Sequence, residues 1–135
     1  MSKNRISKFV REPKIMENIR DIEIKILTNS CRYEDIVKLR FYASKGYSLA
    51  LVDYATCLMS GIYVEKDDEE AIKCLSLAKK NASSYELYLI GVTYLNFSDI
   101  PRYLKEAENC LQKSVEMGFQ ESLDVLLYIA DLYSN

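Results

Sequence analysis

Small residues recur along this chain at a fixed interval, and each of them separates two helical patterns. Gly46, Ala82 and Gly118 stand 36 residues apart in both steps. Self-similarity at such a period is typical of stacked repeats, and small residues at matched places permit the close helix crossings that stacking requires. The recurrence therefore predicts an all-α fold built as a tandem of antiparallel helix pairs. The other matched positions are Ala55 with Gly91, Ala71 with Ala107, Cys74 with Cys110, Ala78 with Ser114, and Tyr54 with Ile90 and Leu126.

Apolar residues at helical spacing place about seven individual helices. The first stripe consists of Ile15, Ile19, Ile22 and Ile26. Asn29 or Ser30 is expected to cap the start of the second helix, and Asp67 or Asp68 that of the fourth. No segment reads as a strand. The expected helices cover about 14–28, 32–44, 47–59, 67–80, 84–95, 102–116 and 120–133.

Length and charge predict one domain with a distinct N-terminal segment. The 135 residues suffice for a single core, and 49% apolar with 28% charged residues is ordinary for a globular protein. Residues 1–20 hold six basic side chains against two acidic ones. We expect a basic arm over 1–13 and one helical-repeat domain over 14–135. The arm is either a frayed, solvated terminus or a contact for an anionic surface or acidic partner.

Charge and hydropathy also limit the partners and the location. Outside the arm the chain is acidic, which argues against nucleic-acid binding as its main role, because phosphate contacts need clustered Lys and Arg. No apolar run approaches the roughly 20 residues that span a bilayer, and no signal-peptide pattern precedes the helices. We expect a cytoplasmic protein that binds neither nucleic acid nor membrane.

The side chains that carry most catalytic chemistry are sparse. The chain has no histidine, no phosphate-binding glycine loop and no paired cysteine motif of a metal finger. We expect the four cysteines to be buried and reduced, and the acidic run over 65–70 to be a solvated helix start. The sequence thus predicts a protein that is not an enzyme and has no cofactor and no metal site. A hidden enzyme that uses Cys57 or a Tyr-carboxylate pair is the alternative. The cysteines are Cys31, Cys57, Cys74 and Cys110.

One stretch of the chain resembles a known repeat. It reads Gly46-x3-Ala50, Ala55, Gly61-x2-Val64-x2-Asp67-x3-Ala71-x6-Ala78. This spacing resembles the Sel-one-like repeat, a branch of the tetratricopeptide-like superfamily. The resemblance implies a right-handed α-solenoid that acts as an interaction scaffold.

The resemblance extends unevenly along the chain. Repeats 46–81 and 82–117 are the best matches, 118–135 is half a repeat, and 14–45 is a degenerate preceding unit. The first unit departs at Tyr63, where the family has a glycine, and at Cys74, where it has an aromatic residue. The second unit lacks the glycine loop.

The first helix of each pair in such a solenoid lines the concave face. Counting from the three small landmarks gives a groove that is apolar at one end, tyrosine-rich in the middle and acidic at the other. Tyrosine is favoured at binding sites, and an acidic groove suits a basic partner. Alternatively, Tyr85, Tyr88 and Tyr128 only pack on neighbouring helices. The candidate partner-binding residues are Leu49, Val52, Thr56, Tyr85, Tyr88, Val92, Asn96, Glu121, Asp124, Tyr128 and Asp131.

Size, charge and the family resemblance lead to two functional hypotheses. The first is a small immunity protein that binds a basic bacterial toxin domain and occludes its active site. The second is a general adaptor that bridges signalling or secretion components. We expect a monomer or a one-to-one complex with a protein partner, with a weak homodimer as the alternative.

Overall fold

The structure is a computed structural model that describes the backbone of residues 2–97 and 100–134 and the side chains of residues 13–97 and 102–134. Within these residues the chain is helical and has no strand, so the all-α prediction is confirmed. None of the described helices combines the length and apolarity needed to cross a bilayer. The elements are α1 (Ser2–Leu27), α2 (Tyr33–Ser44), α3 (Ser48–Ser60), α4 (Asp68–Ala78), the 3₁₀ turn η1 (Lys79–Asn81), α5 (Ser84–Leu95), α6 (Ile100–Glu116) and α7 (Glu121–Tyr133).

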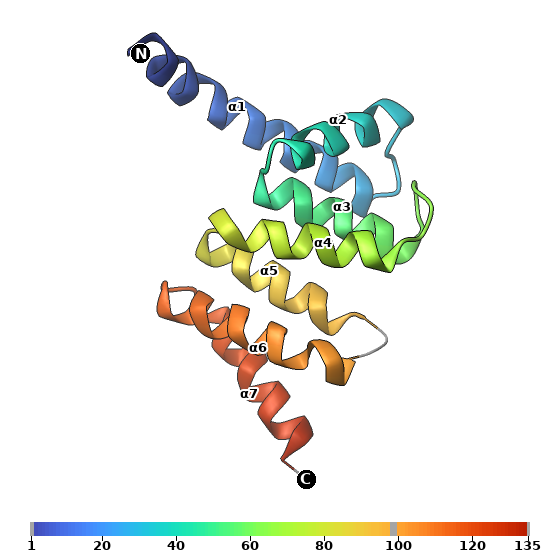
Figure 1. Cartoon of the computed structure of the whole chain (residues 1–135), viewed down its shortest axis with the longest axis vertical. Coiled ribbons are helices and arrows are strands. Elements are labelled where there is room, and N and C mark those ends of the chain that lie inside the picture. The colour runs from blue at the N-terminus through green and yellow to red at the C-terminus, as the bar shows by residue number, and fades with distance from the viewer. Residues whose placement is uncertain (1, 98–99, 135) are drawn as a thin grey trace.

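The helices pack mainly on their neighbours in sequence. The most extensive contacts join α5 to α6 and α3 to α4, followed by α2 to α3 and α6 to α7. Contacts two elements apart join α3 to α1 and to α5. As a result the helices succeed one another along the long axis of the molecule, and the two termini lie at opposite ends (Figure 1).

Helix α1 is longer than expected. It begins at Ser2 and not near residue 14, and it contains Pro13 in its interior. The predicted arm over 1–13 is thus helical in backbone from Ser2, although nearly all of its side chains lie outside the described residues. The predicted stripe is confirmed, because Ile19 and Ile22 are buried and Ile15 and Ile26 pack against the same core.

Two of the helix starts follow capping rules that the sequence displays. Asp67 caps α4, where its carboxylate accepts the Glu70 backbone N–H at 3.0 Å. Ser83 and Glu86 form a reciprocal capping box at the start of α5, with bonds of 3.2 and 2.8 Å. Each satisfies backbone donors that have no partner inside the helix.

The bounds of α2 agree with the predicted 32–44, but its capping residue was predicted wrongly. Its N-cap is Arg32, whose backbone N–H donates to Asp35 at 2.9 Å. Asn29 instead adopts φ 56° after the end of α1, and the Ser30 amide donates to the Lys25 carbonyl at 2.8 Å. Both polar residues are therefore used to close α1, and neither caps the next helix.

The 36-residue interval has a counterpart in the hydrogen bonds. The Ser48 hydroxyl donates to the Ala78 carbonyl at 2.8 Å. One interval later, the Ser114 hydroxyl donates to the Ser84 carbonyl at 2.6 Å. The same junction, between the start of one helix and the end of the next, is bonded in both units with donor and acceptor exchanged.

The three landmark residues do not share one backbone conformation. Gly46 and Gly118 have φ values of 90° and 103°, which favour glycine. Ala82 has φ −76°, because the 3₁₀ turn η1 intervenes between the end of α4 and this position. The interval thus preserves the place of the turn and not its geometry.

Tyr63 occupies a strained position in the loop after α3. Its φ of 73° lies in the left-handed region that favours glycine, the residue that the repeat resemblance places there. The Tyr63 hydroxyl donates to the Asn29 side-chain oxygen at 2.8 Å. A left-handed conformation costs a non-glycine residue about 1–2 kcal/mol, and this bond to the α1–α2 turn offsets part of it.

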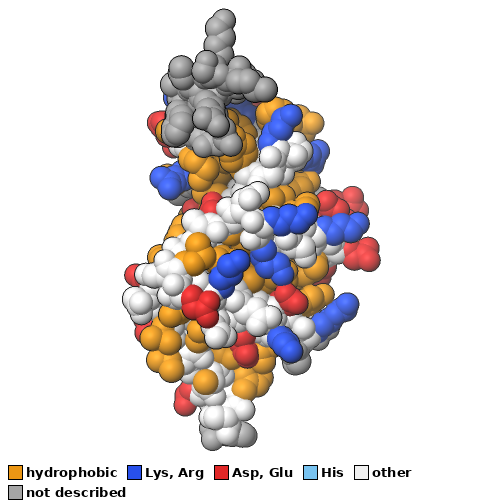
Figure 2. Space-filling view, turned by 60° about the vertical axis from the view of Figure 1, so that its left-hand side comes forward, with side chains coloured by type: hydrophobic (Ala, Val, Ile, Leu, Met, Phe, Trp, Pro, Cys, Tyr) orange, Lys and Arg blue, Asp and Glu red, His pale blue; other side chains and the backbone are white. Residues whose placement is uncertain are grey.

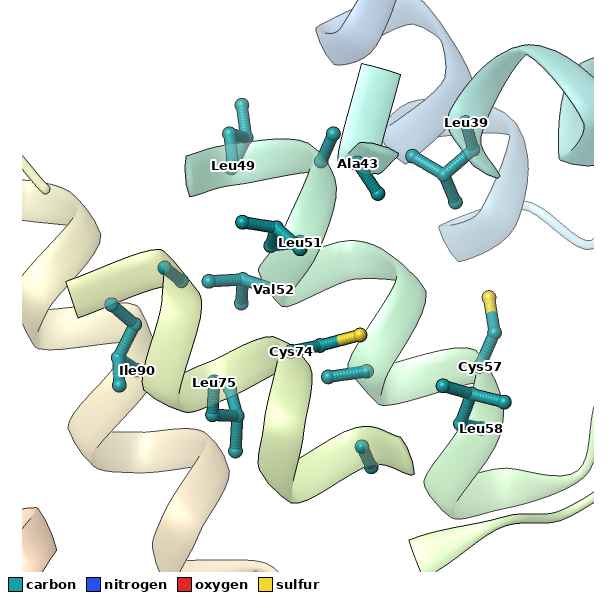
Figure 3. Close-up of a cluster of buried hydrophobic side chains, with 14 of the residues drawn as sticks. Leu39, Ala43, Leu49, Leu51, Val52, Cys57, Leu58, Cys74, Leu75 and Ile90 are labelled. Atoms are coloured by element: carbon teal, nitrogen blue, oxygen red, sulfur yellow. The ribbon is translucent and has the colours of Figure 1, made fainter. Parts of the chain in front are cut away.

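The core is centred on α3, which is apolar on nearly every side. Leu51, Ala55 and Leu58 are buried, and the Cys74 side chain of α4 points towards α3 (Figure 3). A helix that is hydrophobic all round is typically enclosed by other helices. Contacts with α1, α2, α4 and α5 enclose α3 in this way.

Candidate partner-binding surface

The structure divides the predicted partner-binding residues by accessibility. Leu49 and Val52 are buried, and each residue has 3% of its surface exposed. Tyr88 and Val92 are half-buried. The exposed members are Thr56, Tyr85, Asn96, Glu121, Asp124, Tyr128 and Asp131.

Leu49 and Val52 belong to the core, which corrects the predicted apolar end of the groove. Both side chains lie in the buried cluster around α3 (Figure 3). The spacing rule assumed that one face of the first helix stays free, but α3 is covered by four other helices. In this conformation Val52 is not accessible to a partner, and Leu49 contributes only to the wall of the cleft at the start of α3.

Tyr85 and Tyr88 form an aromatic cluster with Phe119 from the turn before α7. Their rings stack on each other at 6.3 Å between centroids, and the Phe119 ring lies 5.6 and 5.1 Å from them. The alternative that these tyrosines pack on neighbouring elements is therefore correct for part of each ring. Tyr85 nevertheless keeps 44% of its surface exposed.

Helix α7 presents an acidic, tyrosine-bearing surface. Glu121, Asp124 and Asp131 are exposed, as is 62% of Tyr128. The helix contains no Lys or Arg. Figure 2 shows hydrophobic and acidic side chains at the lower end of the molecule, which holds α7. The predicted acidic end of the surface is present as exposed side chains.

A cleft of about 760 Å³ lies at the N-terminal ends of α3 and α5. Arg20 of α1 and Lys45 before α3 line it together with Tyr85 and Glu86. The charges here are mixed, so the acidic character of the predicted groove does not extend to this end. The sequence analysis missed Arg20 and Lys45 because it counted candidate residues only from Gly46 onwards, and both residues precede Gly46.

Glu23 of α1 and Asp53 of α3 form a carboxylate pair that sequence reasoning also missed. The Glu23 Oε2 and Asp53 Oδ2 atoms are buried without a hydrogen-bond partner among the described residues. Burial, followed by the negative charge of the nearby Glu23 carboxylate, raises the pKa of Asp53 to about 9. Asp53 is thus protonated at neutral pH. A signal was present, since Asp53 is the one charged residue of α3.

The same carboxylates affect a tyrosine of the surface. Burial and then the charges of Glu23 and Asp53 raise the pKa of Tyr85 above its usual range. Its hydroxyl is protonated at neutral pH, as that of an ordinary tyrosine also is, and it can donate a hydrogen bond. This connects the carboxylate pair to the exposed edge of the aromatic cluster.

The cysteines are placed as the sequence predicted, with one exception. Cys57, Cys74 and Cys110 are buried, whereas Cys31 is half-buried, and all four are free thiols. Burial raises the pKa of Cys57 and of Cys74 to about 11, which keeps both thiols protonated and poorly nucleophilic at neutral pH. In the described part of the chain no cluster of three or more His, Cys, Asp or Glu side chains is arranged to hold a metal ion.

Comparison with protein-family models, with curated proteins and with solved structures gives no match to this chain.

Proposed function

We propose that this chain is a non-catalytic protein-binding module that holds a basic protein partner on the surface formed by α5 and α7. The observation that carries the proposal is that tyrosine rings and carboxylates are exposed together on these helices. Exposed aromatic rings contribute little to the stability of a monomer but can contribute to the binding of a partner. Tyr85 and Tyr128 are 44% and 62% exposed, and all three acids of α7 face solvent. Exposed rings with a hydroxyl give binding energy, and uncompensated negative charge selects a cationic partner.

The arrangement that we propose for these helices is a right-handed solenoid of the Sel-one-like type. The exchanged hydrogen bonds of Ser48 and Ser114 support a repeating helix pair. The contacts between α3 and α5 support the stacking of first helices side by side. In such a scaffold the tyrosines and acids fall on one continuous surface.

Within this proposal the finer hypothesis is an immunity protein that occludes a basic toxin domain. A second hypothesis, an adaptor for several partners, is favoured by the mixed charges of the cleft at Arg20 and Lys45. The two differ in affinity. A dedicated inhibitor is expected to bind one partner at a Kd near or below about 1 nM, close to −12 kcal/mol. An adaptor is expected to bind several partners in the micromolar range.

The experiment is a native pull-down from the source cells at low and raised salt, followed by Kd measurement with the partner that it recovers. We expect Tyr88→Ala/Asp124→Ala and the more exposed Tyr128→Ala to weaken binding at least about tenfold, the loss typical of a contributing interface residue. Tyr33→Ala/Glu34→Ala, which changes an exposed pair on α2, serves as the matched control. Unchanged affinity with retained helicity in the first two variants would exclude this surface.

A further inference from the structure

One face of α7 is exposed at positions that are buried in both preceding units. The residues one and two intervals earlier lie on α5 and α3, whose most extensive contacts are with α6 and α4, and each is at most 4% exposed or, for Gly91, also classed as buried. In α7 the same positions are open to solvent, with Leu123 at 40% and Leu127 at 60% exposed. The three sets are Leu51, Ala55 and Leu58 in α3, Leu87, Gly91 and Tyr94 in α5, and Leu123, Leu127 and Ala130 in α7. We call the last set the open face.

The open face has the wrong shape for another helix packed as closely as those before it. A Cβ atom on Gly91 would lie 2.7 Å from the Leu111 side chain and 3.2 Å from the Ala107 carbonyl, which shows how closely α6 crosses α5. Leucine occupies the matched position in α7. Leu127 therefore projects as a knob, and a covering helix has to offer a small residue opposite it.

The charged residues of α7 that flank the open face are all negative. Asp124 and Asp131 lie next to Leu127 around the helix at 100° per residue, and both are exposed. Within α7 no Lys or Arg balances them. Two copies of α7 packed face to face would bring like charges together, which disfavours a second copy as the occupant.

We propose that the open face of α7 docks a basic amphipathic helix of a protein partner, seated as α4 sits on α3 and α6 sits on α5. The occupant is a helix because helices cover the same positions in both preceding units. It is basic because the rim is acidic. The open face shares the exposed acids Asp124 and Asp131 with the surface of the proposed function, on which its basic occupant therefore rests, whereas Tyr85 and Tyr88 are not part of it.

The test uses the full chain and a defined probe. The probe is a synthetic amphipathic peptide of about 18 leucine and lysine residues, long enough to form a helix on binding, with one alanine at the centre of its apolar stripe. Its counterpart has glutamate in place of every lysine. Binding is followed by fluorescence anisotropy at low and raised salt, and the mass of the free protein by sedimentation velocity.

We expect one lysine peptide to bind per protein, with affinity that falls as salt rises. Leu123→Ser/Leu127→Ser should weaken binding at least tenfold, and Leu127→Gln alone should weaken it severalfold without loss of helicity. The control Val37→Ser/Leu77→Ser changes apolar side chains of similar exposure, 45% and 49%, on α2 and α4 and should bind as the parent does. Loss of peptide binding in Tyr88→Ala together with unchanged binding in the two α7 variants would place the peptide on the aromatic cluster and overturn the proposal.

Three results would overturn the proposal. The first is that both α7 variants bind the lysine peptide as tightly as the parent protein does. The second is that the parent protein binds the glutamate peptide as tightly as the lysine peptide. The third is that the parent protein is a dimer that Leu123→Ser/Leu127→Ser converts to a monomer. The last result would make a second copy, and not a basic helix, the occupant of the open face.

Discussion

Asp53 links the folding of this chain to pH through its buried contact with Glu23. Its pKa in the folded protein is raised to about 9, whereas an aspartate in an unfolded chain titrates near 4. Between these values the folded state holds a proton that the unfolded chain releases. Because the folded state binds more protons, stability falls as the pH rises from about 4 towards 9.

Asp53→Asn should remove this pH dependence. The amide keeps the shape of the protonated acid and can donate to Glu23, but it has no proton to lose. We expect the variant to lie close to the parent near pH 4.5 and to gain on it by up to about 1.4 kcal/mol for each further pH unit, so that the difference in the free energy of unfolding at pH 8 is several kcal/mol. Urea unfolding at pH 4.5, 6 and 8 measures the difference.

The exposed residue Asp131 provides the control for that comparison. Asp131→Asn on α7 should leave the pH dependence of the parent unchanged. A stability difference between Asp53→Asn and the parent that stays constant with pH would contradict the assignment. Besides Glu23, the ionisable groups that interact with Asp53 are Cys57 and Tyr85.

Single residues show where sequence reasoning stops. Asp53 is unusual because it is the one charged residue in the apolar segment 48–60. Its partner Glu23 is 30 residues earlier, on a different helix, and no pattern in the sequence indicates that this helix contacts α3. Leu49 and Val52 have the spacing of groove residues, yet only the enclosure of α3 by four helices decides that they are buried. Periodicity describes one helix at a time, and burial depends on how many others surround it.

The crossing of α5 and α6 depends on the absence of one side chain. Gly91 lies inside a helix, where glycine costs roughly 0.5–1 kcal/mol relative to alanine. Its matched residue in the 46–81 unit is Ala55, which is fully buried against α4. At Gly91 the Leu111 side chain and the Ala107 carbonyl leave no room for a Cβ atom, which accounts for glycine at this position.

Gly91→Ala should therefore destabilise the protein despite its better helix propensity. We expect a net loss of about 1–2 kcal/mol, because a Cβ at 2.7 Å from Leu111 forces the packed helices to shift. Leu111→Ala alone should cost about 2–5 kcal/mol through the cavity that it creates. The double variant should lose less than the sum of the two, since alanine at 111 makes room for alanine at 91. Denaturant unfolding of all four proteins gives the coupling energy, and additive losses would contradict the contact.

Helix positions could be predicted better than their ends. The capping of α4 by Asp67 was readable because the acid precedes an amphipathic run directly. The cap of α2 could not be predicted in the same way. Asn29 and Ser30 are both favourable capping residues, but in the structure they close the end of α1. Likewise the 36-residue interval predicts that helices cross at Ala78 and Ser114, but not that the bond there reverses its direction.

Packing between neighbouring helices determines how far the effect of a destabilising substitution spreads through the molecule. The main contacts run from α1 through α2 to α3, from α3 to both α4 and α5, and from α5 to α6, whereas the described contacts of α7 run chiefly to α6. In a chain of nearest-neighbour contacts, stability is close to a sum of local terms, and a defect at one end reaches the other only weakly. The interval in the sequence already implied this arrangement, but the full length of α1 could not be predicted, because Pro13 favours a helix start there.

Ile129→Ala tests this behaviour. Ile129 is 4% exposed and anchors α7, so its truncation should cost about 2–5 kcal/mol locally. Amide hydrogen exchange should then accelerate in α7 and in α6, while α2 and α3 keep the protection of the parent. Leu123→Ala, at an exposed position of the same helix, should change exchange little anywhere. Equal acceleration in all helices would mean that the chain unfolds as one cooperative unit, and the description of its stability by neighbouring contacts would then be wrong.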